Sequence, residues 1–186
     1  MENRDKVQED ILNKLKYPVH GLLNLAPRVG KTLLAINILK KEGCKKVLWV
    51  TPDRKLRDIG LPKEFKKWKA LTLLKNVDII CYNSLHKVKG KYDKIVLDEY
   101  QHITVNNSKG LIEGSLQYGS IIGLSGTHPK HLEKHEIYSK LNLKVLSEMS
   151  IDEAVDEKLI APYKITVIGV KLDNINKNVL LSHKKY

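Results

Sequence analysis

The stretch Leu22-Leu23-Asn24-Leu25-Ala26-Pro27-Arg28-Val29-Gly30-Lys31-Thr32 decides the fold class of this sequence. Its first four residues predict a short strand, and the apolar side chains after Thr32 predict a largely buried helix over residues 32–41. A strand that turns into a helix at Gly-Lys-Thr points backbone N–H groups and the positive end of the helix dipole at one place. The stretch therefore predicts a phosphate-binding loop. We expect Lys31 to contact the β- and γ-phosphates of a nucleoside triphosphate and the Thr32 hydroxyl to bind Mg²⁺.

The residues between the strand and the helix are the candidate nucleotide ligands. We expect the following residues to surround the phosphates: Pro27, Arg28, Val29, Gly30, Lys31 and Thr32. An ordinary strand-to-helix turn is the alternative, and the correct context on both sides disfavours it. One departure stands out, because the full pattern has a glycine where this sequence has Leu25.

The stretch Ile95-Val96-Leu97-Asp98-Glu99-Tyr100-Gln101 supplies the second half of such a site. An apolar strand here delivers two adjacent carboxylates at its carboxyl end, where ligands bind in open α/β sheets. Asp98 can hold the Mg²⁺ through water, and Glu99 can act as general base on the attacking water. Paired acids after a strand are also common as a helix cap. Found downstream of Gly-Lys-Thr, they predict a catalytic role for Lys31, Asp98 and Glu99.

Short β-rich runs alternate with helical patterns along the chain. This alternation is typical of an α/β domain with a mostly parallel central sheet flanked by helices. We expect helices over residues 3–16, 32–41, 54–68, 131–141 and 151–157, and strands over residues 22–25, 47–50, 77–81, 95–97, 121–124 and 163–170.

The composition limits the class of protein. There are 33 Lys and Arg against 21 Asp and Glu, a net charge of +12, which indicates a polyanion partner or a lysine-rich compositional bias. No apolar run is long enough to span a bilayer, and the charged start has no signal-peptide core behind it. We expect a cytoplasmic protein without membrane contact, in a bacterial or phage-infected host cell. A disulfide between Cys44 and Cys81 is possible, but nothing else indicates an oxidising compartment.

The motifs, taken in order, resemble those of the superfamily 2 helicases and translocases, of the DEAD/DEAH-like, phage or Swi/Snf type. Residues 26–32 are similar to motif I, and Asp98-Glu99-Tyr100-Gln101 resembles the DEAH/DExQ box. Further matches are residues 48–52 with motif Ia, 61–68 with the Glu-Phe-x-Lys-Trp helix, 81–85 with the Thr-Tyr-x-x-Leu motif, and 124–129 with motif III. Helicase loops usually have a glycine where Arg28 stands. Either the loop is shaped differently here, or the Arg28 side chain swings out and adds a phosphate contact.

The resemblance implies a RecA-like P-loop ATPase domain that binds ATP and Mg²⁺ and couples hydrolysis to movement on nucleic acid, DNA rather than RNA. It implies nucleotide contacts for Gln8 and Gln101, and places the following residues near nucleic acid or in its coupling to the nucleotide: Thr51, Pro52, Arg54, Tyr82, Ser84, Ser125 and Thr127. Phe65 and Trp68, three residues apart on a helix, are expected to be core anchors rather than base-stacking platforms.

The resemblance also implies a second RecA-like domain, in the full protein or in trans, which carries an arginine finger. We expect residues 1–150 to be the first motor domain and residues 151–186 to be a passage toward the second. Hydrolysis by this chain alone should then be slow or absent. The alternative hypothesis is a non-catalytic nucleic-acid-binding or regulatory module that retains the helicase shape.

Overall fold

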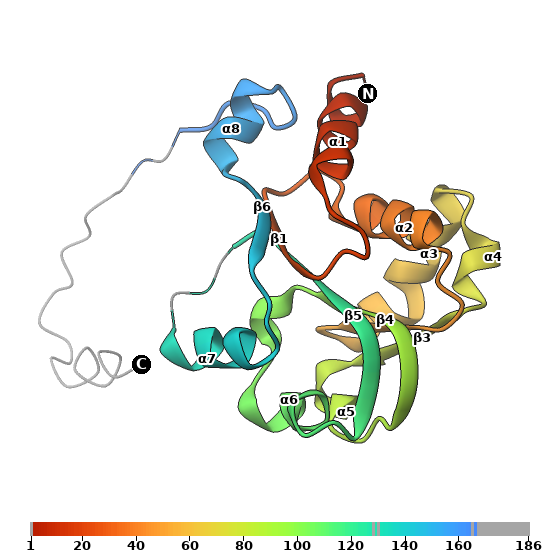
Figure 1. The fold of residues 1–186 in the computed structure, drawn as a ribbon. Coiled ribbons are helices and arrows are strands. Elements are labelled where there is room, and N and C mark those ends of the chain that lie inside the picture. The colour runs from red at the N-terminus through yellow and green to blue at the C-terminus, as the bar shows by residue number, and fades with distance from the viewer. Residues whose placement is uncertain (1, 128, 130, 165, 167–186) are drawn as a thin grey trace, which may run out of the picture.

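A single six-stranded sheet forms the centre of the molecule, as the computed structural model shows (Figure 1). The structure describes residues 2–127, 129, 131–164 and 166. The strand order is β3-β2-β4-β5-β1-β6, and every neighbouring pair is parallel. The strands are β1 Gly21–Leu25, β2 Val47–Thr51, β3 Val77–Cys81, β4 Gly90–Asp98, β5 Leu116–Ser125 and β6 Val145–Met149. The predicted fold class, an α/β domain with a parallel sheet, is confirmed.

Helices cover both faces of this sheet (Figure 1). They are α1 Glu2–Lys14, α2 Lys31–Glu42, α3 Leu61–Lys67, α4 Leu71–Leu74, α5 Tyr82–Leu85, α6 Val105–Ile112, α7 Leu132–Lys140 and α8 Ile151–Asp156, with a π-helical turn η1 Leu56–Gly60 and a 3₁₀ turn η2 Tyr100–His102. Helices α1, α2 and α3 pack on one face, and α5, α6 and α7 pack on the other.

Alternation along the strands divides the core into two layers. In β2, Trp49 packs toward α2 and α3, whereas its neighbours Leu48 and Val50 pack toward α5. Successive strand side chains point to opposite faces, so a strand that is covered on both sides must be apolar at every position. Trp49 is fully buried and meets Phe65 of α3 edge to face, with ring centroids 5.6 Å apart. Phe65 is therefore a core anchor, as expected.

The parallel arrangement brings the carboxyl ends of the strands to one edge of the sheet. Asn24 of β1 pairs with Ser125 at the end of β5, and Asp98 at the end of β4 pairs with Leu124 of β5. The phosphate-loop segment after β1, the acidic pair after β4 and the polar end of β5 therefore lie at the same edge. This edge is the usual place for a ligand in an open α/β sheet.

The elements differ from the expected ones in a few places. The helix expected over residues 54–68 is a π-helical turn followed by α3, and neither α6 nor the edge strand β6 was expected. Residues 163, 164 and 166 are not part of a strand, and the rest of the strand expected over 163–170 lies outside the described residues. Cys44 and Cys81 are both free and buried. Within the described part of the chain, no helix is long and apolar enough to cross a membrane.

Candidate functional site

The loop between β1 and α2 contains two residues in the left-handed backbone conformation, and one of them is an arginine. Arg28 has φ 67° and Gly30 has φ 91°, both in the left-handed region. Helix α2 begins at Lys31, and the preceding Gly30 provides no side-chain cap. The first N–H groups of a helix have no partner within it, so these groups are available to an anion. The loop therefore keeps the left-handed turn that a glycine would make at Arg28, which disfavours the alternative that the loop is shaped differently here.

Helix α1 supports this loop through Gln8. The Gln8 Nε2 donates a hydrogen bond to the Val29 carbonyl at 2.6 Å and lies 3.5 Å from the Gly30 carbonyl. A Cβ atom on Gly30 would come within 2.3 Å of the same nitrogen, so a larger residue would displace the Gln8 side chain, and the φ of 91° favours glycine in addition. Gln8 is thus beside the candidate nucleotide site, with its amide nitrogen used to hold the loop.

Lys31 reaches from the start of α2 across the carboxyl ends of β1 and β5. Its Nζ donates to the Leu25 carbonyl at 3.2 Å. A Cβ atom on Gly126, just beyond β5, would lie 3.6 Å from that nitrogen. The ammonium group therefore stands between the loop and the end of β5, where a bound phosphate would meet it.

The acidic pair completes the same edge of the sheet. Desolvation by burial, followed by repulsion from Glu99, raises the pKa of Asp98 to about 6 against the opposing effects of Trp49 and Lys31. The Trp49 Nε1 donates to Asp98 Oδ2 at 3.5 Å. Glu99 has φ 51°, a second left-handed residue in the site. A divalent cation would relieve the repulsion between the two carboxylates, so this pair fits a Mg²⁺ site.

A Mg²⁺ ion in a nucleotide site needs few protein ligands. Mg²⁺ in nucleotide sites keeps several waters and uses one or two protein ligands together with the phosphates. Thr32, partly exposed at the start of α2, and Asp98 could supply those ligands. Among the described residues, no group of three or more His, Cys, Asp or Glu side chains could hold a metal ion.

A chain of polar contacts links the acidic pair to the end of β5. The Gln101 Nε2 donates to Glu99 Oε2 at 3.0 Å, and the Ser125 Oγ lies 2.7 Å from Gln101 Oε1. The Ser125 Oγ also lies 2.7 Å from the Thr127 carbonyl and accepts from the Thr127 N–H at 3.0 Å. Because Ser125 has one hydroxyl proton, it can donate to Gln101 or to Thr127 at any moment. The structure thus brings Gln101, Ser125 and Thr127 together.

The residues expected near nucleic acid fall into two groups. The side chains of Thr51 and Tyr82 are buried, with the Thr51 Oγ1 3.2 Å from the Ile80 carbonyl and the Tyr82 hydroxyl donating to the Asp98 carbonyl at 3.1 Å. Burial raises the pKa of Tyr82 well above its ordinary value. Arg54 and Ser84 are exposed and Pro52 is partly exposed. Contact with a nucleic-acid backbone is therefore open to the second group, whereas Thr51 and Tyr82 shape the strand ends beneath it.

A hollow of about 440 Å³ adjoins the loop and includes a residue that sequence reasoning assigned to the core. Trp68 is half-buried, lines this hollow and donates from Nε1 to Glu64 Oε2 at 2.8 Å. The Arg4 guanidinium lies 5.3 Å from its ring. The hollow also includes Arg28, Gly30 and Thr32, so it adjoins the residues that are predicted to bind the phosphates. Helical spacing alone could not show that Trp68 faces α1 across this hollow.

Three solved structures share this fold. The ATP-dependent Type ISP restriction-modification enzyme LlaBIII bound to DNA has a TM-score of 0.57 and 17% identity, over 84% of this chain and 15% of that chain. The Pyrococcus furiosus Hef helicase domain has a TM-score of 0.54 and 17% identity, over 78% and 36%. The Sulfolobus solfataricus SWI2/SNF2 ATPase core in complex with dsDNA has a TM-score of 0.56 and 16% identity, over 84% and 46%.

These neighbours are superfamily 2 helicase and translocase domains, so the chain has the fold of that class. The chain spans less than half the length of each of these structures. No protein-family model and no curated protein matches the sequence.

Proposed function

We propose that this chain is the ATP-binding motor domain of a superfamily 2 DNA helicase or translocase. One observation carries the proposal: the carboxyl edge of the sheet brings together the Gly30-Lys31-Thr32 turn, the acidic pair and Ser125, each from a different strand end. The fold shared with ATP-dependent and DNA-bound neighbours supports it. A phosphate loop without the acids, or acids without the loop, would support no reaction.

Each residue of the site has a distinct part in the proposed reaction. Lys31 and the N–H groups at the start of α2 bind and orient the phosphates. Bound Mg²⁺ would neutralise charge on the β- and γ-phosphates. Thr32 and Asp98 would hold that ion, and Glu99 would orient and deprotonate the attacking water. Gln101 contacts both Glu99 and Ser125, and we propose that it couples the acidic pair to the end of β5.

The nucleic acid and a second RecA-like domain complete the proposed machine. Exposed Arg54 and Ser84 lie after β2 and β3, at the same sheet edge as the nucleotide site. In two-domain motors ATP lies in the cleft between the domains, and the second domain supplies a cation to the transition state. We therefore propose that turnover by this chain alone is slow.

The first test is the binding of a non-hydrolysable ATP analogue, measured by calorimetry with and without Mg²⁺. We expect Mg²⁺-dependent binding that Lys31→Ala abolishes, because the variant lacks the ammonium group that contacts the β- and γ-phosphates. Lys40→Ala is the matched control, since Lys40 is an exposed lysine on the same helix, at the end far from the loop. Equal affinities of the wild type and Lys31→Ala for the ATP analogue would contradict the proposal.

The net charge of +12 favours a second candidate, a non-catalytic nucleic-acid-binding module with the helicase shape. Such a module would bind DNA with an affinity that nucleotide does not alter. A motor domain would change its DNA affinity when the ATP analogue is added. Measuring DNA binding with and without the analogue separates the two candidates.

A further inference from the structure

Arg28 has a backbone conformation that an arginine does not adopt without a reason. Its φ of 67° lies in the left-handed region, where the Cβ atom of a residue other than glycine approaches the backbone carbonyl too closely. A residue that is held in such a conformation inside a candidate site is grounds for a functional hypothesis. Glycine would make the same turn without strain. What Arg28 adds, and glycine cannot, is its guanidinium group.

That guanidinium group is free within the described part of the chain. The Arg28 side chain is exposed and makes no hydrogen bond or ion pair with another described residue. Of the other cations around the loop, Lys31 donates to the Leu25 carbonyl and Arg4 lies over the Trp68 ring. Lys67 pairs with Glu64, whereas Lys158 is a second exposed cation in the hollow but lies outside the loop. An arginine has five N–H donors in a planar fork that matches phosphate oxygens.

The place of Arg28 directs this free group at the proposed nucleotide. Arg28 lines the hollow beside the loop together with Gly30 and Thr32. The catalytic edge itself has two carboxylates, Asp98 and Glu99, against one lysine, Lys31. A triphosphate brings more negative charge to this edge. The nearest unengaged cation on the loop is Arg28.

We propose that Arg28 is a catalytic residue that stabilises the transition state of phosphoryl transfer in cis, in addition to the cation that the proposed second domain supplies. This inference rests on the proposed function. In the reaction, the water oxygen forms a bond to the γ-phosphorus as the bond to the β–γ bridging oxygen breaks. The bridging oxygen keeps the electron pair and leaves with ADP, and the water proton passes to Glu99 and then to the released phosphate. The Arg28 guanidinium neutralises the charge that gathers on the transferred group and the leaving oxygen.

The test uses a transition-state analogue, so that it does not depend on a slow rate. Calorimetry measures the affinity of the chain for ADP and Mg²⁺, with and without fluoroaluminate, which occupies the place of the transferred phosphoryl group. We expect fluoroaluminate to tighten ADP binding by about 100-fold or more in the wild type. In Arg28→Gly this gain should be lost, while the affinity for ADP alone changes by less than about threefold.

Two further variants separate the guanidinium from charge and backbone effects. Arg28→Lys keeps a charge but not the planar fork, so it should recover only part of the gain. Lys69→Gly is the matched control, because Lys69 is also a cation with positive φ, 50°, and it lies outside the hollow. It should behave as the wild type. Single-turnover hydrolysis should fall by about 100-fold in Arg28→Gly and should not change in Lys69→Gly.

Three results would overturn the proposal. Arg28→Gly could keep the full gain from fluoroaluminate, which would leave Arg28 without a role in the transition state. It could weaken ADP and ADP with fluoroaluminate equally, which would make Arg28 a ground-state contact. If instead the wild type binds neither ADP nor an ATP analogue, the proposed function itself fails, and this inference fails with it.

Discussion

At the scale of single residues, the fold changes the pKa of Asp98, a residue of the candidate site. Its pKa is raised to about 6, first by burial and then by repulsion from Glu99. A carboxyl group whose pKa is higher in the folded than in the unfolded state destabilises the fold when it is ionised. That penalty is complete above pH 6 and disappears as the pH falls from about 6 toward 4, the ordinary range of an aspartate.

Asp98→Asn should therefore raise the free energy of unfolding of the ligand-free chain at pH 8. The gain should shrink to nothing as the pH falls from 6 to 4, in urea unfolding followed by circular dichroism. The matched control has the opposite sign. Two backbone N–H groups, of Lys45 and Lys46, lower the pKa of Asp93. Asp93→Asn should therefore destabilise the chain at neutral pH, and a gain from both variants would contradict the assignment.

The same group sets the pH dependence of ligand binding. The carboxylate of Asp98 must be ionised to hold Mg²⁺, so the Mg²⁺-dependent affinity for an ATP analogue should fall as the pH drops below about 6. The affinity measured without Mg²⁺ should change less over the same range. Calorimetry at pH 5, 6, 7 and 8 tests this, and a flat Mg²⁺-dependent affinity would show that Asp98 does not ligate the ion.

At the scale of elements, the sequence predicted those that combine an apolar pattern with a motif. β1, α2 and β4 are of this kind, because burial on both faces makes their apolar residues continuous. The edge strand β6 was missed because Val145 and Leu146 are partly exposed there and polar residues follow. Helix α6 was missed because it contains polar residues and a glycine, and its start depends on a capping box between Thr104 and Asn107.

The site divides in the same way. Motif spacing predicted that Lys31, Asp98 and Gln101 lie at one edge of the sheet, because the segments that carry them follow the ends of β1 and β4. It could not show the burial of Tyr82 or the contact of Gln8 with the Val29 carbonyl, because both depend on how distant segments pack. Such contacts join residues that no local pattern connects.

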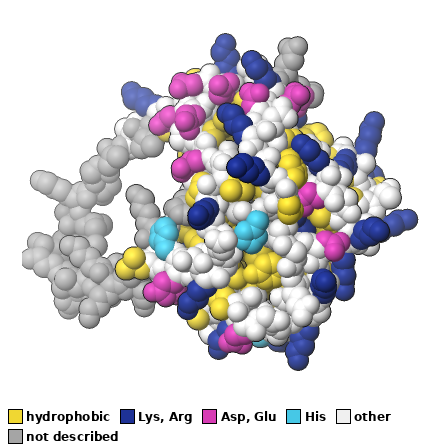
Figure 2. Space-filling model, in the orientation of Figure 1, with side chains coloured by type: hydrophobic (Ala, Val, Ile, Leu, Met, Phe, Trp, Pro, Cys, Tyr) yellow, Lys and Arg dark blue, Asp and Glu magenta, His cyan; other side chains and the backbone are white. Residues whose placement is uncertain are grey.

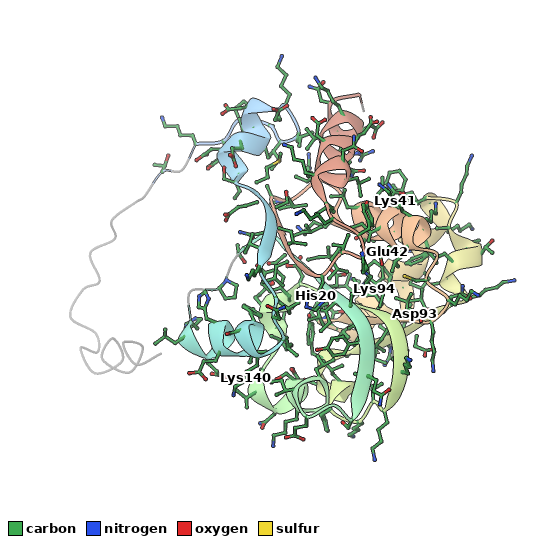
Figure 3. All side chains as sticks on the ribbon, viewed as in Figure 1. His20, Lys41, Glu42, Asp93, Lys94 and Lys140 are labelled. Atoms are coloured by element: carbon green, nitrogen blue, oxygen red, sulfur yellow. The ribbon has the colours of Figure 1, made fainter. Side chains whose placement is uncertain are left out.

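One buried ion pair connects three segments at the opposite edge of the sheet, and no sequence pattern predicted it. Lys94 of β4 is fully buried, and its Nζ lies 2.7 Å from Glu42 Oε2 at the end of α2 and 2.6 Å from the Val19 carbonyl before β1 (Figure 3). Burial lowers the pKa of Lys94, while Glu42 opposes that shift. The Val19 N–H donates to Glu42 Oε1 at 2.8 Å. The pair therefore connects the segment before the phosphate loop to the helix after it.

Lys94→Ala should lower the free energy of unfolding by about 3–5 kcal/mol, because it leaves the Glu42 carboxylate buried without its partner. The double variant Lys94→Met with Glu42→Gln should lose less free energy of unfolding than the sum of the losses from Lys94→Met alone and Glu42→Gln alone. The reason is that the double variant leaves no charge unpaired. Urea unfolding of the four chains measures this coupling. Strict additivity would show that the two side chains do not act as a pair.

At the scale of the whole molecule, the acidic side chains are unevenly distributed. Figure 2 shows many Asp and Glu side chains gathered near α1 and α8, whereas Lys and Arg side chains are spread around the whole outline of this face. The segment after β2 carries many of the cations: Arg54, Lys55, Arg57, Lys63, Lys66, Lys67 and Lys69. Arg54 and Lys55 follow the carboxyl end of β2, and Lys67 lines the hollow beside the phosphate loop. A polyanion is therefore attracted to the region where the motor proposal places it.

Duplex DNA binding should consequently weaken steeply with salt, and the logarithm of the affinity should fall linearly with the logarithm of the salt concentration. Arg54→Ala should reduce that slope by about one, because one phosphate contact and its released counterion are lost. Lys45→Ala is the control, since Lys45 is an exposed cation just before the amino end of β2, whereas Arg54 follows the carboxyl end of β2. It removes the same charge from the molecule, so an equal change in slope would mean that net charge, not the carboxyl edge, attracts the DNA. Fluorescence anisotropy over a salt series measures both slopes. If the salt slope decreases for Arg54→Ala but not for Lys45→Ala, the DNA lies over the same sheet edge as Lys31 and Asp98. Control of DNA binding by the nucleotide requires this position.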